Sequence, residues 1–333
     1  MNMLQWLQAL PKSRKPLPLL SFPSVSLTGE SVYSVTHDAK KQAEGVKAIA
    51  EALDLAAAVT MMDLSVEAEA FGATLSHSEN EVPTVLGELL SAEEDGLEGA
   101  EALGVPKIGA GRTALFVEAA RLAKSYVSDR PTLAGIIGPY SLYGRLTGVS
   151  EALMNCLCEE EFSHAVLEKT TAFLISYGAA FKAAGLDGIV MAEPLAGLLS
   201  PELCAEFSAP YVKRIVDALQ DESFVVIYHN CGPNVVNMTA SLAGIGAAAY
   251  HFGDAIDLTK MLSQMPSDTV IMGNISPTDQ FLNGTPESMT EAVFALSERV
   301  KGYDNFVLSS GCDIPPHAKW DTIRAFVLAA GKQ

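Results

Sequence analysis

Short apolar runs alternate along the chain with longer segments in which apolar residues recur at helical spacing. This alternation predicts repeated strand–helix units whose strands pair in parallel. Several runs are apolar throughout rather than at every second position, as expected of strands buried on both faces. The eight predicted strands are Leu17–Phe22, Ala56–Met62, Leu133–Ile137, Gly188–Met191, Phe224–Tyr228, Ala248–His251, Val270–Gly273 and Phe306–Ser309.

The segments between these strands carry helix start and stop signals. Ser200-Pro201 and Thr285-Pro286 each place a capping side chain before a proline, which favours a helix start. Gly185 follows a long apolar repeat and predicts its end. The predicted helices are Lys40–Leu53, Glu161–Ala184, Leu203–Leu219, Ala292–Val300 and a last helix that Pro316 opens and that ends near Ala330.

Eight strands that alternate with helices favour a closed (β/α)₈ barrel of the TIM type, which is an α/β fold. We expect a single domain over residues 1–333, because barrels of this kind commonly exceed the usual domain length. An open doubly wound sheet is the alternative. Residues 76–130 follow the alternation less well, since 76–99 are acidic and polar, and we expect an excursion near the barrel mouth there.

Composition narrows the choice of partners. The chain has 22 basic and 40 acidic residues, a formal charge of −18. Phosphate backbones and anionic lipids would repel it, so we expect neither a nucleic acid nor a membrane as partner. Near the start of the chain the basic residues follow the apolar ones, the reverse of a secretory signal. No apolar run is long enough for a membrane span. Five scattered cysteines favour a reducing, cytoplasmic location, and a homo-oligomer is left open.

The main chemical signal is a histidine and two cysteines that follow predicted strands. His229 and Cys231 are two positions apart at a strand end, so their side chains point to the same side. Cys312 ends another strand, and in a parallel barrel all carboxyl ends share one rim. One imidazole and two thiolates suit zinc, and three protein ligands leave the open fourth position of a catalytic site. The alternative is structural, since free cysteine is often simply buried.

Two carboxylates are candidate catalytic residues at the same rim. Glu193 follows the strand that ends at Met191, and it is either a weak fourth metal ligand or the cap of the next turn. Asp63 follows the strand that ends at Met62. Glu67 and Glu69, a few positions further on, are expected to orient the ligands through hydrogen bonds.

Other polar residues after strands are candidates for contact with a substrate. Asn274 and Ser276 follow Gly273 and are expected to bind the polar tail of an acceptor. Tyr140, after Gly138-Pro139, is expected to line the mouth. His251 also ends a strand, but a lone histidine in such a place is more often part of a hydrogen-bonded framework than a ligand.

Several segments together resemble the uroporphyrinogen decarboxylase superfamily and, within it, the branch of methylcobamide:coenzyme M methyltransferases. The resemblance implies a TIM barrel with its active site at the carboxyl-end rim, and zinc held by the His-x-Cys…Cys set. That set corresponds here to His229, Cys231 and Cys312. The resemblance rests on these residues and on Val25–Gly29, Ser65–Gly72, Gly188–Leu199, Gly273–Ser276 and Ser310–Cys312.

One departure from the superfamily bears on the reaction. Uroporphyrinogen decarboxylases carry an arginine-rich stretch after the first strand, which binds the carboxylates of their substrate. The corresponding stretch here, Ser21–Gly29, contains no arginine. This departure argues against uroporphyrinogen decarboxylation.

The function that we expect is a zinc-dependent methyltransferase. Bound to zinc, a thiol such as coenzyme M becomes a thiolate that attacks the methyl group of a methylated corrinoid. The chain lacks the Asp-x-His-x-x-Gly pattern that accompanies cobalamin binding, so we expect the methylcobamide on a separate corrinoid protein. Two alternatives stay open: a corrinoid-dependent tetrahydrofolate methyltransferase on the same barrel, and a non-catalytic zinc-binding barrel.

Overall fold

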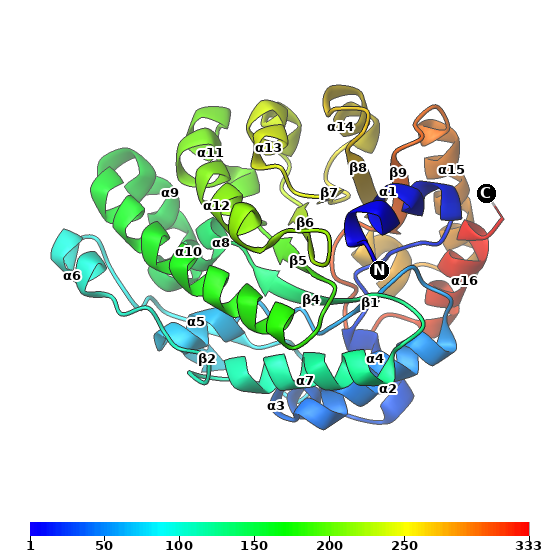
Figure 1. Cartoon of the computed structure of the whole chain (residues 1–333), viewed down its shortest axis with the longest axis horizontal. Coiled ribbons are helices and arrows are strands. Elements are labelled where there is room, and N and C mark those ends of the chain that lie inside the picture. Colours follow the sequence, from blue (N-terminus) through cyan, green and yellow to red (C-terminus); the bar gives the residue numbers. More distant parts are fainter. Residues whose placement is uncertain (333) are drawn as a thin grey trace.

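A curled sheet of seven parallel strands, covered by helices, organises the computed structural model, which describes residues 1–332 (Figure 1). Each strand pairs with the next one of the sheet along the chain, which confirms the predicted α/β class and the parallel pairing. A separate antiparallel hairpin joins β2 to β3. The strands of the curled sheet are β1 (Ala58–Val59), β4 (Thr132–Ile137), β5 (Gly188–Ala192), β6 (Val225–Asn230), β7 (Ala249–Phe252), β8 (Val270–Ile275) and β9 (Phe306–Ser310).

Both faces of this sheet are buried, which explains why its strands are apolar without alternation. On one face, alternate residues such as Val190, Ile227 and Met272 pack in a cluster enclosed by the curl. The intervening residues, such as Met191 and Ile271, pack in a second cluster that includes the surrounding helices. The sheet therefore has a hydrophobic core on each of its two faces.

Helix α1 (Met3–Ser13) covers the amino ends of the strands. Its apolar residues Met3 and Leu7 belong to the enclosed cluster. Its backbone and side chains also bind the loops that precede β6 and β8: Met3 N donates to Glu222 O at 2.6 Å, and Gln8 Nε2 donates to Asp268 O at 3.2 Å. Only the carboxyl-end rim of the enclosed space lies away from this helix.

The first predicted strand, Leu17–Phe22, is not a strand. Leu17 N donates to Leu308 O of β9, and Ala56 N, just before β1, donates to Pro16 O, both at 3.0 Å. The segment thus lies between the two edge strands of the sheet. Pro16 and Pro18 have no backbone N–H, so a regular ladder cannot form on either side of Leu17.

The other helices form the outer layer of the molecule. Two predicted helices, Lys40–Leu53 and Glu161–Ala184, are confirmed with a shift of one residue. The helix bounds are α2 (Val25–Thr28), α3 (Val32–His37), α4 (Ala39–Ala52), α5 (Val66–Phe71), α6 (Gly96–Ala102), α7 (Thr113–Tyr126), α8 (Pro139–Thr147), α9 (Val149–Cys158), α10 (Glu160–Ala183), α11 (Pro201–Phe207), α12 (Ala209–Leu219), α13 (Thr239–Ile245), α14 (Leu258–Gln264), α15 (Pro286–Val300) and α16 (Trp320–Ala330).

Prolines account for two helix predictions that were wrong in detail. The helix predicted over Leu203–Leu219 is divided at Ser208, because Pro210 lacks an N–H and its ring disfavours the preceding helical turn. The last helix begins at Trp320 rather than at Pro316, after a turn in which Ala318 N donates to Pro315 O. Its predicted end at Ala330 is confirmed.

The excursion expected at 76–130 stays a prediction, because only part of this segment departs from the strand–helix order. The hairpin of β2 (Thr74–Ser76) and β3 (Thr84–Leu86), followed by α6, departs from the strand–helix order. Helix α7, in contrast, packs against α4 and β4 as part of the outer layer. Among residues 1–332, no helix combines the length and apolar character of a membrane span.

A buried carboxylate joins β5 to α8. Glu193, just after β5, accepts hydrogen bonds from Tyr140 N at 2.8 Å and from Ser141 N at 3.0 Å, at the start of α8. A carboxylate there satisfies free N–H groups and the helix dipole. Gly138 makes room, since a Cβ on it would lie 2.2 Å from Glu193 Cγ. Burial nevertheless raises the pKa of Glu193 to about 7.

We expect Glu193→Gln to change the pH dependence of stability. The pKa of this carboxyl lies near 7 in the folded chain, whereas an unburied glutamate has a pKa near 4.5. Folding therefore favours the protonated form, and this stabilisation is present at low pH and is lost as the pH rises through 7. We would measure the free energy of unfolding in urea from pH 5 to about 8. As the pH rises over this range, the variant should gain stability relative to the parent protein.

The matched control is Glu44→Gln, at an exposed glutamate of the outer helix α4 whose Oε1 lies 3.8 Å from Lys40 Nζ. Its stability difference from the parent protein should stay nearly constant over the same pH range. A Glu193→Gln difference as flat as that of the control would contradict the expectation.

Candidate metal centre

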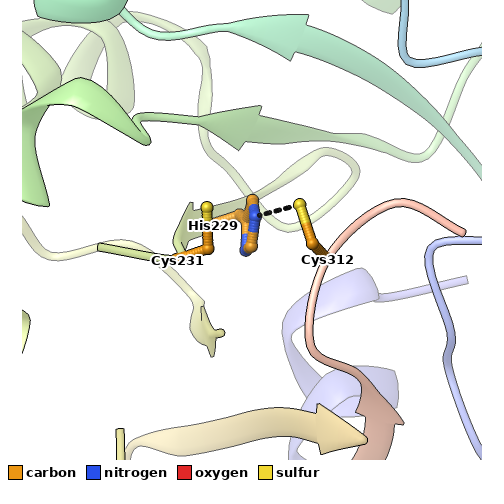
Figure 2. Close-up of side chains that lie close together, drawn as sticks. All are labelled: His229, Cys231 and Cys312. Carbon is orange, nitrogen blue, oxygen red and sulfur yellow. Dashed lines mark hydrogen bonds between the residues drawn. The ribbon is translucent and has the colours of Figure 1, made fainter. Parts of the chain in front are cut away.

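The structure brings His229, Cys231 and Cys312 together at the carboxyl-end rim of the sheet (Figure 2). His229 lies in β6, Cys231 follows that strand, and Cys312 follows β9. Their ligand atoms all lie within 4.8 Å of one another. Within residues 1–332, this is the only group of three or more histidine, cysteine or acidic side chains so arranged.

The spacing of these atoms fits a tetrahedral zinc ion. Zinc bonds of about 2.05 Å to nitrogen and 2.3 Å to sulfur, at the tetrahedral angle, place the two donor atoms about 3.6 Å apart. Cys312 Sγ lies 3.4 Å from His229 Nε2, close to that value. The set of one imidazole and two thiols is also one that zinc prefers. The residues therefore fit the ion.

The two thiols differ in their affinity for a proton. A hydrogen bond from Cys312, and then the nearby His229, lower the pKa of Cys231. The pKa of Cys312 is raised, because it holds the shared proton beside Cys231 and is partly buried. The pair thus favours one thiolate and one thiol, and binding of a metal to both would release the remaining proton.

Close backbone contacts hold the turn that carries Cys231. A Cβ on Gly232 would lie 2.4 Å from Gly197 Cα, and a Cβ on Gly253 would lie 2.5 Å from Cys231 Cβ. Asn230 Oδ1 accepts from Gly232 N at 2.9 Å, which closes the turn. The two glycines are required because a side chain at either place would displace the ligand loop.

The second ring nitrogen of His229 is bound to another histidine. His229 Nδ1 lies 2.8 Å from His251 Nδ1, and His251 Nε2 lies 2.7 Å from Ser309 Oγ. His251 is fully buried, and burial holds its pKa well below the usual value, so the ring is neutral. The expectation that His251 belongs to a hydrogen-bonded framework agrees with this arrangement, whereas Ser309 was missed.

Asp63 lies in a buried ion pair. Its Oδ2 accepts from Arg112 Nη1 at 2.7 Å, and its Oδ1 accepts from Ser65 Oγ at 2.6 Å. Arg112 also donates to Glu69 Oε2 at 2.7 Å. Arg112 was missed in the sequence, because an isolated arginine in a loop carries no periodic signal. Both oxygens of Asp63 are thus engaged in hydrogen bonds. A catalytic role for Asp63 stays a prediction.

Glu67 is buried and only half satisfied. Its Oε1 accepts from Ile137 N at 3.0 Å, at the end of β4, whereas its Oε2 has no hydrogen-bond partner. Burial raises its pKa to about 8. The side chain therefore connects α5 to the end of β4, and it lies outside the cluster of His229, Cys231 and Cys312.

Glu193 also lies outside the group formed by His229, Cys231 and Cys312. Its two oxygens are occupied by the start of α8. The alternative expected from the sequence was a cap of the next turn, whereas Glu193 caps α8, which precedes β5 in the chain. A part for Glu193 in catalysis or as a fourth ligand stays a prediction.

The three residues expected to contact a substrate differ in their placement. Tyr140 lies in the core rather than at the mouth: it is 0% exposed, and its hydroxyl donates to Ala152 O. Asn274 and Ser276 lie at the end of β8 and after it, where both are partly exposed. Asn274 Nδ2 donates to Gly253 O, and Ser276 Oγ caps the following turn.

Comparison with known proteins places the chain among methyltransferases and decarboxylases. It is 28% identical over 281 residues to the methylcobamide:CoM methyltransferase MtbA of Methanosarcina acetivorans, covering 83% of this chain and 80% of the relative. A uroporphyrinogen decarboxylase of Christiangramia forsetii is 25% identical over 219 residues and covers less, 63% of this chain and 62% of its own.

The fold has a close counterpart among solved structures. A methyltransferase from Methanosarcina mazei superposes with a TM-score of 0.86 at 22% identity, covering 100% of this chain and 99% of that one. The sequence profile of the uroporphyrinogen decarboxylase (URO-D) family matches residues 24–333. The predicted superfamily is thereby confirmed, and the chain belongs to the uroporphyrinogen decarboxylase family.

Proposed function

We propose that this protein is a zinc-dependent methyltransferase that moves a methyl group from a methylated corrinoid protein to a thiol such as coenzyme M. One observation carries the proposal: a histidine and two cysteines at one rim offer ligand atoms within 4.8 Å of one another. Three protein ligands leave the open position that a catalytic zinc requires. The names of relatives such as MtbA, a methylcobamide:CoM methyltransferase, support the same reaction.

The proposal assigns separate tasks to the residues at the rim. His229, Cys231 and Cys312 hold the ion, and the two thiolates nearly cancel its charge. Zinc bound there supplies a Lewis acid that lowers the pKa of an added thiol. Asn274 and Ser276, partly exposed after β8, are proposed to face the polar tail of the acceptor.

The methyl transfer itself balances without a further reactant. The sulfur–carbon bond forms in the acceptor, the cobalt–carbon bond of the partner's corrinoid breaks, and the electron pair of that bond stays on cobalt. The proton of the thiol is released when the thiol binds. This chain therefore has to bind and orient the acceptor and to present it to the corrinoid protein.

We also propose that the sheet closes into a barrel. In it, residues 16–20 occupy the place of a first strand between β9 and β1. The hydrogen bonds from Leu17 N to Leu308 O and from Ala56 N to Pro16 O support this closure. Residues 21–29, which include α2, contain no arginine, and this supports a reaction other than decarboxylation.

A tetrahydrofolate acceptor remains the second candidate on the same barrel. Its attacking atom would be a nitrogen, for which soft thiolate ligands around zinc give no clear advantage. A non-catalytic zinc site is the third. It would need a fourth firm protein ligand, and Glu193, the carboxylate considered for that place, is engaged at the start of α8.

We expect about one zinc ion per chain and a strong loss of zinc in Cys312→Ser. A hydroxyl is a poor zinc ligand, so affinity should fall by more than the roughly 10–100-fold that loss of an outer hydrogen-bond partner costs. Elemental analysis and competition with a chelator measure both quantities. Cys158→Ser, at an exposed cysteine on α9, is the control and should keep the metal. Full retention of zinc by Cys312→Ser would remove Cys312 from the site.

We expect an added thiol to enter the zinc shell. Zinc-edge X-ray absorption should gain one sulfur at about 2.3 Å when coenzyme M is added, because the thiolate takes the open position. The hydroxyl analogue 2-hydroxyethanesulfonate is the matched control and should add no sulfur. An unchanged zinc shell with every thiol, together with methylation of tetrahydrofolate by the same preparation, would favour the second candidate.

We expect the purified chain to carry no corrinoid. The visible absorption of cobalamin should be absent, and methyl transfer to a thiol should begin only when a methylated corrinoid protein or free methylcobalamin is added. The basis is the missing cobalamin-binding pattern. Stoichiometric cobalamin absorption in the purified protein would show instead that the donor binds permanently to this chain.

A further inference from the structure

We propose that His251 and Ser309 are positioning residues that fix the tautomer of His229, so that its Nε2 lone pair faces the metal position. This inference rests on the proposed metal centre, but its first test needs no metal. The three side chains continue the inner face of the sheet at its carboxyl end. They lie two positions after Ile227, Ala249 and Val307, which belong to the enclosed cluster.

The direction of the hydrogen bonds is set at Leu17. Its carbonyl oxygen can only accept, and it lies 2.6 Å from Ser309 Oγ. The single proton of the Ser309 hydroxyl is therefore donated to Leu17. The Ser309 oxygen is left to accept from His251 Nε2 at 2.7 Å, which requires that this nitrogen carry a proton.

The tautomer of His251 in turn determines the tautomer of His229. A neutral imidazole has one N–H, so a proton on His251 Nε2 leaves a lone pair on His251 Nδ1. That lone pair lies 2.8 Å from His229 Nδ1, which must then donate. The backbone carbonyl of His251, 3.3 Å from the same nitrogen, can also only accept. Both neighbours thus require the proton on Nδ1 of His229.

The consequence reaches the metal-binding atom. With its proton on Nδ1, His229 has a free lone pair on Nε2, the nitrogen 3.4 Å from Cys312 Sγ. The opposite tautomer would direct an N–H at the metal position and leave two lone pairs facing each other at Nδ1. Metal-bound histidines usually donate their second N–H to a carboxylate or a carbonyl. Here a neutral imidazole has that role and adds no charge to the centre.

The first experiment reads the tautomers directly. NMR of the histidine ring nitrogens in metal-free, isotope-labelled protein should show His229 protonated at Nδ1 and His251 protonated at Nε2. A metal-free His229 protonated at Nε2 would overturn the proposal. Because this measurement uses the unaltered chain without zinc, it can succeed even if the proposed methyl transfer proves wrong.

The second experiment removes the anchor without touching the ligand. In Ser309→Ala, His251 loses the acceptor of its Nε2 proton. The ring can then carry its proton on Nδ1, the nitrogen that faces His229. We expect zinc affinity, measured by chelator competition, to fall by about 10–100-fold, the usual effect of losing an outer partner of a metal ligand. Ser309→Thr keeps the hydroxyl and should restore most of the affinity.

Ser310→Ala is the matched control on the same strand. Ser310 is equally buried, and its hydroxyl accepts from Leu19 N at 3.0 Å, so this variant also loses a hydrogen bond to residues 16–20. The contact of Ser310 with His251 is made by its backbone, which the substitution keeps, so this variant should retain its zinc affinity. Equal losses of zinc affinity in the two alanine variants would mean a general structural effect and would overturn the proposed positioning role.

Discussion

The in-register pairing of parallel strands is the constraint on which the candidate metal centre depends. Cys231 and Cys312 are 81 positions apart in the sequence, yet each follows the carboxyl end of its strand. Pairing of β6 with β7 sets His229 directly beside His251. A shift of either strand by one residue would turn its side chains to the other face and separate the two imidazoles. Backbone hydrogen bonds therefore determine where the ligands meet.

Much of this architecture could be predicted because it depends on local patterns. Seven of the eight apolar runs are strands, and His229, Cys231 and Cys312, which were expected to converge from their places after such runs, do lie together. Zinc chemistry itself stays a proposal. The arrangement of the cysteines is nevertheless the part of the site for which sequence spacing and geometry agree.

The features that were not predicted depend on particular side chains and on long-range contacts. Pro16 and Pro18 remove N–H groups from a run that is otherwise apolar enough for a strand, and Pro210 divides a helix whose apolar pattern continues across it. Tyr140 follows a strand, but its ring is buried between helices. The partnership of Arg112 with Asp63 joins residues 49 positions apart, and no periodicity announces it.

The cover that α1 forms over the amino ends of the strands has a consequence for the order of events in the proposed reaction. The enclosed space is filled by apolar side chains, with α1 at that end, so the acceptor and the donor protein of the proposed reaction would both approach from the carboxyl-end rim. A docked protein would close that rim to other molecules. The proposed reaction would then have a compulsory order, in which the acceptor enters before the donor protein docks and the methylated product leaves after it dissociates.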